Sequence, residues 1–161
     1  MNQNTSTPSN QTSNQANAYL KTRVMSASPE ELRLLLLEGA LKFARQGLEG
    51  IKRLDHEATY SGISQCRNII FELMTSIRNE IDPELASKVR ALYNFMYSLS
   101  IEAAHEKDAT KVEKLIELLD YERETWVLLM NRLASEKSAA TATATAKPAS
   151  DAPRSPLSVS A

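Results

Sequence analysis

The sequence predicts an all-helical fold: an antiparallel up-down-up-down four-helix bundle with an N-terminal segment packed on it and disordered tails. The 161 residues include only four glycines and six prolines, and four of the prolines lie near the two ends. The centre of the chain therefore contains few helix breakers. Its apolar residues recur every three or four positions in four segments, which is typical of amphipathic helices. The segments are joined by only a few residues, and short links favour antiparallel neighbours.

Composition divides the chain into three parts. Residues 1–17 are almost all Asn, Gln, Ser and Thr, and predict a disordered tail because they can bury little apolar area. Residues 18–136 contain the predicted bundle domain with its N-terminal capping segment. Residues 137–161 are rich in Ala, Thr and Pro and predict a second disordered tail.

The first helix of the bundle has a strong start signal. Ser28 is suited to the N-cap, Pro29 to the first helical position, and Glu31 to closing a capping box. Its apolar residues form two adjacent stripes: Leu36, Ala40, Phe43 and Gly47 beside Leu34, Leu37, Leu41, Ala44 and Leu48. This apolar face is wider than one seam requires, so we expect the helix to contact more than one neighbour.

The other three helices each show one regular apolar seam. The second, roughly residues 57–80, has Ile63, Cys66, Ile70, Leu73 and Ile77. The third begins at Asp82 and Pro83 and has Leu85, Val89, Leu92, Met96, Leu99 and Ala103. The fourth follows a predicted cap at Asp108 and has Val112, Leu115, Leu119, Glu122, Trp126, Leu129 and Leu133. Only Glu122 interrupts these seams.

Charge and cysteine content indicate a cytoplasmic protein. With 19 basic and 20 acidic residues the net charge is -1, which argues against binding to nucleic acid. The single cysteine, Cys66, forms no internal disulfide, as is usual in a reducing compartment. No basic residue precedes Lys21 and no long apolar run occurs, so we expect neither a secretory signal nor membrane insertion.

No residue pattern indicates catalysis. Glu102 and His105 have the spacing of a di-iron ligand pair, but the pair occurs once and both residues point away from the apolar seam of their helix. Cys66 lies on a seam, where core packing is the expected role. The sequence contains no Gly-rich phosphate loop or nucleophile elbow. We therefore expect no enzyme, no catalytic residue, no cofactor and no metal.

Apolar residues outside the seams predict a surface for a partner chain. Tyr93, Tyr97 and Ile101 follow each other at steps of four, about 100° to 180° away from the seam of their helix. Leu37 and Leu41 extend the apolar face of the first helix. These positions favour a helix bound in a groove. The alternative is that the tyrosines lie at the rim of the bundle with their hydroxyls in water.

The segment before Ser28 offers two further candidate residues. Tyr19 and Val24 lie in a stretch that is apolar enough to pack across one groove of the bundle. The alternative is a local hydrophobic staple between Ala27 and Leu32, which gives Tyr19 no role.

The residues also resemble a known family. The resemblance covers Asn17 to about Asn131 and is most specific at Ala27-Ser28-Pro29-Glu30-Glu31-Leu32. Further matches follow in order: Gly39-Ala40, Ile69-Ile70 with Glu72-Leu73, Leu92-Tyr93 with Met96, and Arg123-Glu124-Thr125-Trp126. On these residues the chain resembles the flagellin-specific export chaperones of bacteria, the FliS family.

This resemblance implies a function. It implies a chaperone that binds the C-terminal region of flagellin in surface grooves, prevents early polymerisation, and helps delivery to a component of the flagellar export gate. It assigns Tyr19 and Val24 to the N-terminal segment and Tyr93 to a groove, whereas Tyr97, Ile101, Leu37 and Leu41 come from helical geometry alone. A structural or self-associating bundle without a flagellin client is the alternative, and a homodimer is left open.

Two features depart from the family pattern. Where the family often has Leu-Tyr-Asp-Gly, this chain has Leu36-Leu37-Glu38-Gly39, so an aromatic hydroxyl is missing. The long Ala/Thr/Pro tail also lies outside the pattern.

Overall fold

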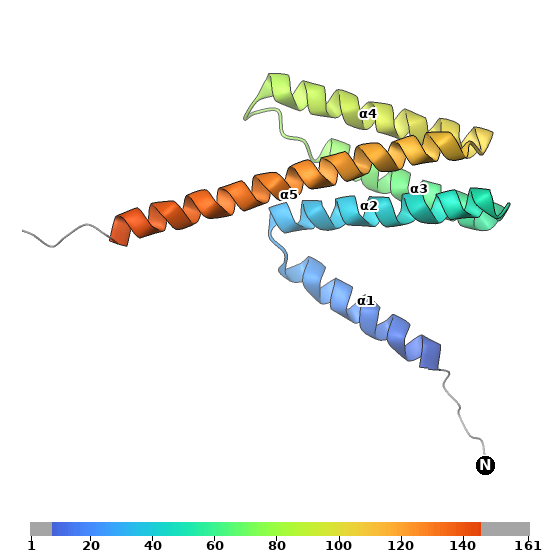
Figure 1. Ribbon diagram of the computed structural model, residues 1–161, viewed down its shortest axis with the longest axis horizontal. Helices are drawn as coiled ribbons and strands as arrows, with labels where there is room; N and C mark the ends of the chain where they lie inside the picture. Colours follow the sequence, from blue (N-terminus) through green and yellow to red (C-terminus); the bar gives the residue numbers. More distant parts are fainter. Residues whose placement is uncertain (1–7, 146–161) are drawn as a thin grey trace, which may run out of the picture. The chain divides into compact units, whose positions relative to one another are not determined.

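The computed structural model describes residues 8–145, and it describes their side chains from residue 17 to residue 139. It contains five helices: α1 (Pro8–Ser26), α2 (Pro29–Lys52), α3 (His56–Thr75), α4 (Pro83–Glu106) and α5 (Ala109–Thr145). No strand occurs in this part of the chain. The predicted all-helical fold is confirmed (Figure 1).

N-cap residues explain where the bundle helices begin, and Ser28 and Asp82 are caps as predicted. At Ser28 the capping box is complete: the Glu31 amide donates to Oγ at 3.2 Å, and the Ser28 amide donates to the Glu31 carboxylate at 2.9 Å. Asp55 and Asp82 cap α3 and α4, each accepting a hydrogen bond from the amide three residues later. These bonds satisfy amides that the helix itself leaves without partners.

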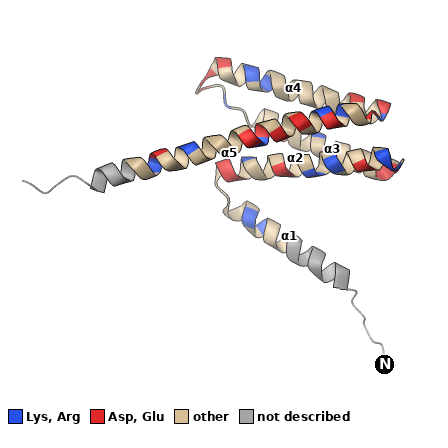
Figure 2. Ribbon diagram, viewed as in Figure 1, with Lys and Arg blue, Asp and Glu red and all other residues tan. Residues whose placement is uncertain are grey.

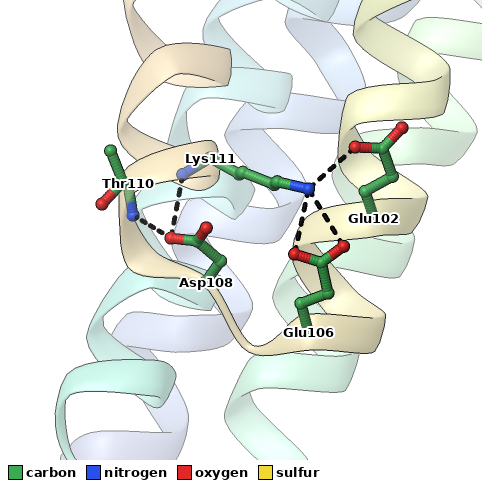
Figure 3. Close-up of polar contacts among 5 residues, drawn as sticks. All are labelled: Glu102, Glu106, Asp108, Thr110 and Lys111. Atoms are coloured by element: carbon green, nitrogen blue, oxygen red, sulfur yellow. Dashed lines mark hydrogen bonds and ion pairs between the residues drawn. The ribbon is translucent and has the colours of Figure 1, made fainter.

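The corner between α4 and α5 is held by a cluster of charged residues (Figure 3). The Asp108 carboxylate accepts a hydrogen bond from the Thr110 amide at 2.8 Å and so caps α5. The Lys111 ammonium lies 2.9 Å from Glu102 and 3.0 Å from Glu106. Hydrogen bonds to these two carboxylates raise the pKa of Lys111 to about 12. The cluster therefore joins the last turns of α4 to the first turn of α5.

The ends of three helices differ from the prediction. α3 ends at Thr75 instead of near Glu80, and the Ser76 hydroxyl donates back to the Leu73 carbonyl at 2.9 Å. Residues 8–17 and 137–145 are helical where composition predicts disorder. Pro8 is suited to a first helical position, and alanine favours continuation of α5. The rest of the predicted tails, residues 1–7 and 146–161, lies outside the described residues.

The core combines the seams of all four bundle helices. The chain divides into two compact units, Met1–Val127 and Leu128–Ala161, and the core lies in the first. Fully or nearly fully buried seam residues include Ile63, Cys66, Ile70, Leu73, Met96, Leu99, Ala103, Val112, Leu115 and Leu119. Toward the end of the α5 seam, Leu129 and Leu133 are exposed, and both belong to the second unit.

The contacts between α2 and α5 join early residues of one helix to late residues of the other. The Trp126 indole donates to the Glu30 carbonyl at 2.9 Å, whereas Lys52 forms an ion pair with Glu113 at 3.3 Å. An early residue of α2 thus contacts a late residue in the α5 portion of the first unit, and the reverse holds at the other end of α2. This order is the one expected of antiparallel neighbours.

Cys66 has the core role that its seam position predicts. Its side chain is fully buried, and burial raises the pKa of the thiol to about 12. Because the thiolate is the reactive form of cysteine, the thiol in the folded chain is chemically inert.

Candidate functional site

Three of the residues predicted to bind a partner lie in the core. Tyr93 has an exposed fraction of 0%, and Leu37 and Leu41 are also buried. The prediction that they form an exposed apolar surface is therefore wrong. A helix in a bundle packs against more than one neighbour, so a residue 100° away from one seam still faces inward.

The buried Tyr93 links three helices through its hydroxyl. An Arg33 N–H group donates to this oxygen at 3.0 Å, and the hydroxyl donates to the Glu122 carboxylate at 3.3 Å. Burial is the main cause that raises the pKa of Tyr93 to about 12. The same network explains why Glu122 interrupts the apolar seam of α5: its carboxylate accepts the hydrogen bond of a buried tyrosine.

Arg33 lies between two aromatic rings. Its guanidinium carbon is 5.6 Å from the centre of the Tyr93 ring and 5.1 Å from that of Trp126. Both distances are within the roughly 6 Å over which a cation is attracted to a ring face. The two rings and the Tyr93 hydroxyl hold the guanidinium in one orientation.

Tyr97 and Ile101 form part of a surface that we call the aromatic ridge, defined as Phe71, Tyr97 and Ile101. Tyr97 is half-buried, and its ring centre lies 6.3 Å from that of Phe71, which comes from α3. Phe71 and Ile101 are exposed. The prediction of apolar surface outside the core therefore describes these residues, and their contact with a partner stays a prediction.

Tyr19 and Val24 lie near the end of α1 and are largely exposed, with exposed fractions of 66% and 45%. The structure thus shows neither side chain buried against the bundle. Five residues of helix separate their directions by about 140°. Their role as contacts of the N-terminal segment stays a prediction.

The structure reveals a further feature that the sequence prediction missed: two adjoining hollows around Trp126. The first has a volume of about 500 Å³ and is walled by apolar residues that include Leu32, Leu36 and Leu73. The second has a volume of about 450 Å³ and is walled by apolar residues that include Ile77, Ile81 and Leu85. Both volumes fall within the range of about 300 to 1,000 Å³ that is usual for binding pockets. We call the two hollows together the trough.

The trough lies where the start of α2, the end of α3, the connection after α3, the start of α4 and the Trp126 side chain of α5 meet. Ile81 and Leu85 have exposed fractions of 86% and 57%. Such exposure of large apolar side chains beside a concave surface is typical of interaction sites. A sequence signal was available, because Ile81 is an apolar residue in a short connection next to the Asp82 cap.

The rest of the described chain offers no obvious alternative chemistry. Among residues 17–139, whose side chains the structure describes, no group of three or more His, Cys, Asp or Glu side chains is placed to hold a metal ion. Glu102 and His105 are exposed, as their helical positions predict. Lys and Arg are interspersed with Asp and Glu along α2, α4 and α5 (Figure 2). Among the described helices, none combines the length and apolarity needed to span a bilayer.

Comparison with known proteins identifies the family. The family model described as flagellar protein FliS matches residues 12–133. A flagellar secretion chaperone FliS of Bacillus subtilis (strain 168) is 30% identical over 109 residues, which cover 68% of this chain and 80% of the relative. A protein of the same name from Vibrio cholerae is 25% identical over 113 residues, which cover 68% of this chain and 83% of the relative.

Both relatives are named as chaperones and not as enzymes, in agreement with the sequence prediction. The family model spans most of the chain, including all the residues that line the trough and form the aromatic ridge. On these matches the chain belongs to the FliS family of flagellar secretion chaperones.

Proposed function

We propose that this protein is a cytoplasmic chaperone for flagellin. It binds the disordered C-terminal region of flagellin, prevents premature polymerisation, and helps deliver flagellin to the gate of the flagellar type III export apparatus. Membership of the FliS family supports a role in flagellar export. The single structural observation that carries the client-binding role is the trough, whose apolar walls are open to a partner chain.

The energetics favour a client that binds over a long path. Burying one large apolar side chain contributes about 1.5 to 3 kcal/mol. Association costs an estimated 4 to 15 kcal/mol in lost rigid-body freedom, and ordering a disordered segment costs about 2 to 5 kcal/mol more. One hollow therefore supplies too little free energy by itself. We infer that the client occupies the trough and continues onto a second apolar surface, for which the aromatic ridge is suited.

The experiment is a titration of the chaperone with the C-terminal region of flagellin from the same organism. Trp126 is the only tryptophan of the chain and lines both hollows, so its fluorescence reports directly on the trough. We expect a saturable fluorescence change together with a gain of helix in the client by circular dichroism. Leu85→Ser should weaken binding about tenfold, because one apolar contact of the trough is lost.

The matched control is Leu54→Ser. Leu54 is an exposed leucine, 80% accessible, in the connection between α2 and α3, and it does not line the trough. We expect this variant to bind like the wild type. Absence of any binding by wild-type protein would contradict the proposed client. A concentration-dependent dimer in sedimentation, undisturbed by flagellin, would favour the self-associating bundle instead.

A further inference from the structure

We propose that the trough recognises a carboxylate flanked by large apolar side chains, and that Arg33 and Arg78 bind this carboxylate. The inference rests on the proposed function, because it names the chemistry of the client segment that the trough takes. It predicts an acidic residue between two apolar residues as the sequence feature of that segment.

Arg33 supplies a fixed cation without an acidic partner. Its guanidinium is half-buried and donates only to hydroxyls, to Tyr93 at 3.0 Å and to Ser76 at 3.5 Å. Among the described residues it forms no ion pair. Arginine has five N–H donors in a planar arrangement that matches a carboxylate, so donors remain for a ligand. Cation–π contacts with two aromatic rings and the hydrogen bond to Tyr93 position the guanidinium before any client arrives.

Arg78 supplies a second cation from the connection between α3 and α4. Its side chain is exposed and has no hydrogen bond or ion pair within residues 17–139. Long unpaired arginines at the rim of an apolar pocket are suited to charge-assisted hydrogen bonds with an incoming carboxylate. Arg78 therefore complements the fixed guanidinium of Arg33 with a second, adjustable one.

The arrangement of the lining residues determines where the carboxylate lies. Both arginines line both hollows, together with Glu30, Ser76 and Trp126, so they mark the junction of the trough. The apolar walls, in contrast, differ between the two hollows. A carboxylate at the junction thus has an apolar pocket on each side, which gives the order apolar, acidic, apolar in the client.

The acidic residues of the trough agree with this placement. The residues that line both hollows include two arginines and one acidic residue, Glu30. Glu72 lines only the first hollow and Asp82 only the second, where its carboxylate already accepts the Leu85 amide at 3.0 Å. Positive formal charge is therefore in excess at the junction, and a client carboxylate is disfavoured nearer either end of the trough.

Two capped tripeptides test the proposal without flagellin. The probes are N-acetyl-Leu-Asp-Leu-amide and its neutral counterpart N-acetyl-Leu-Asn-Leu-amide, which have the same shape. Binding is followed by Trp126 fluorescence and by the single indole N–H resonance in NMR spectra. We expect the Asp peptide to bind at least about fivefold more tightly than the Asn peptide, because only the carboxylate accepts charge-assisted hydrogen bonds from both arginines.

Variants assign the preference to the two arginines. Arg78→Gln should abolish the difference between the peptides, and because the exposed Arg78 side chain forms no hydrogen bond or ion pair within residues 17–139, the fold should be unaffected. Arg33→Lys, checked for unchanged helix content, should reduce the difference, because lysine lacks the planar group that the rings hold. Arg53→Gln is the control, since Arg53 follows the opposite end of α2 and its side chain donates a hydrogen bond to the Glu49 carbonyl at 3.4 Å, away from the trough. It should keep the full preference.

The outcomes separate this inference from the proposed function. Three results would each overturn the carboxylate site. They are equal affinity for the two peptides, no binding of either at 10 mM (about the weakest binding that NMR detects), and an unchanged preference in Arg78→Gln. If the wild-type protein gives one of these results but still binds flagellin, only the carboxylate site is refuted and the proposed chaperone function stands. A clear preference for the Asp peptide without any flagellin binding would support the site and contradict the proposed client.

Discussion

Replacing Gly62 with alanine is expected to destabilise the bundle by about 3 kcal/mol. A Cβ atom at this position would lie 2.4 Å from the backbone nitrogen of Gly47 and 2.8 Å from the carbonyl oxygen of Phe43. These are backbone atoms of α2, so no side chain can rotate away. α2 and α3 would have to separate along a core that is otherwise closely packed. Urea unfolding followed by circular dichroism measures the loss.

The matched control is Gly39→Ala, a glycine-to-alanine change on α2. Here the added Cβ would meet only the end of the Ile69 side chain, at 3.4 Å. Alanine favours a helix over glycine by up to about 1 kcal/mol, so we expect unchanged or slightly higher stability. If both variants unfold at the same urea concentration as the wild type, the close approach of α2 and α3 at Gly62 is incorrect.

Replacing Tyr93 with alanine is expected to cost about 3 to 5 kcal/mol, as is usual when a large buried side chain is truncated. The change leaves a cavity among α2, α4 and α5. It also removes the hydroxyl that bonds to Arg33 and Glu122, so both charged groups lose a partner. Thermal and urea unfolding of the purified variant measure the effect.

Tyr93→Phe separates the two contributions. It keeps the ring and removes only the hydroxyl, and we expect a loss of about 1 to 2 kcal/mol. Any failure of Tyr93→Ala to bind a client would then follow from its lost stability. A Tyr93→Ala protein that is as stable as the wild type but no longer binds flagellin would instead make Tyr93 a direct client contact.

The starts of the helices could be predicted from the sequence because an N-cap involves only residues that are close together in the chain. The predicted Ser28 capping box and Asp82 cap each join residues three positions apart. The Asp55 cap has the same local geometry, although the sequence prediction did not name it. The seams were also predictable, since a buried stripe requires only helical periodicity. The early end of α3 was not, because Ile77 continues the seam pattern although it lies in the connection that follows Thr75.

The position of Tyr93 could not be read from one helix. Its distance from the α4 seam indicated an exposed side chain, but its partners Arg33 and Glu122 come from α2 and α5 and are 60 and 29 residues away. The trough is equally non-local, since it requires parts of four helices and the connection after α3 to meet. By contrast, Ile101 is exposed, as its distance from the seam predicts, whereas Tyr97 is half-buried and packs against the core.

Contacts within the α4–α5 corner also have a consequence for the order of folding. Lys111 contacts residues only five and nine positions away, whereas the bond from Trp126 to Glu30 spans 96 positions. Closing short loops costs less chain entropy, so the hairpin of α4 and α5 can assemble before α2 docks onto it. The client-binding surface is consequently completed late in folding. A newly made chaperone can therefore bind its client only after its own synthesis and folding are finished.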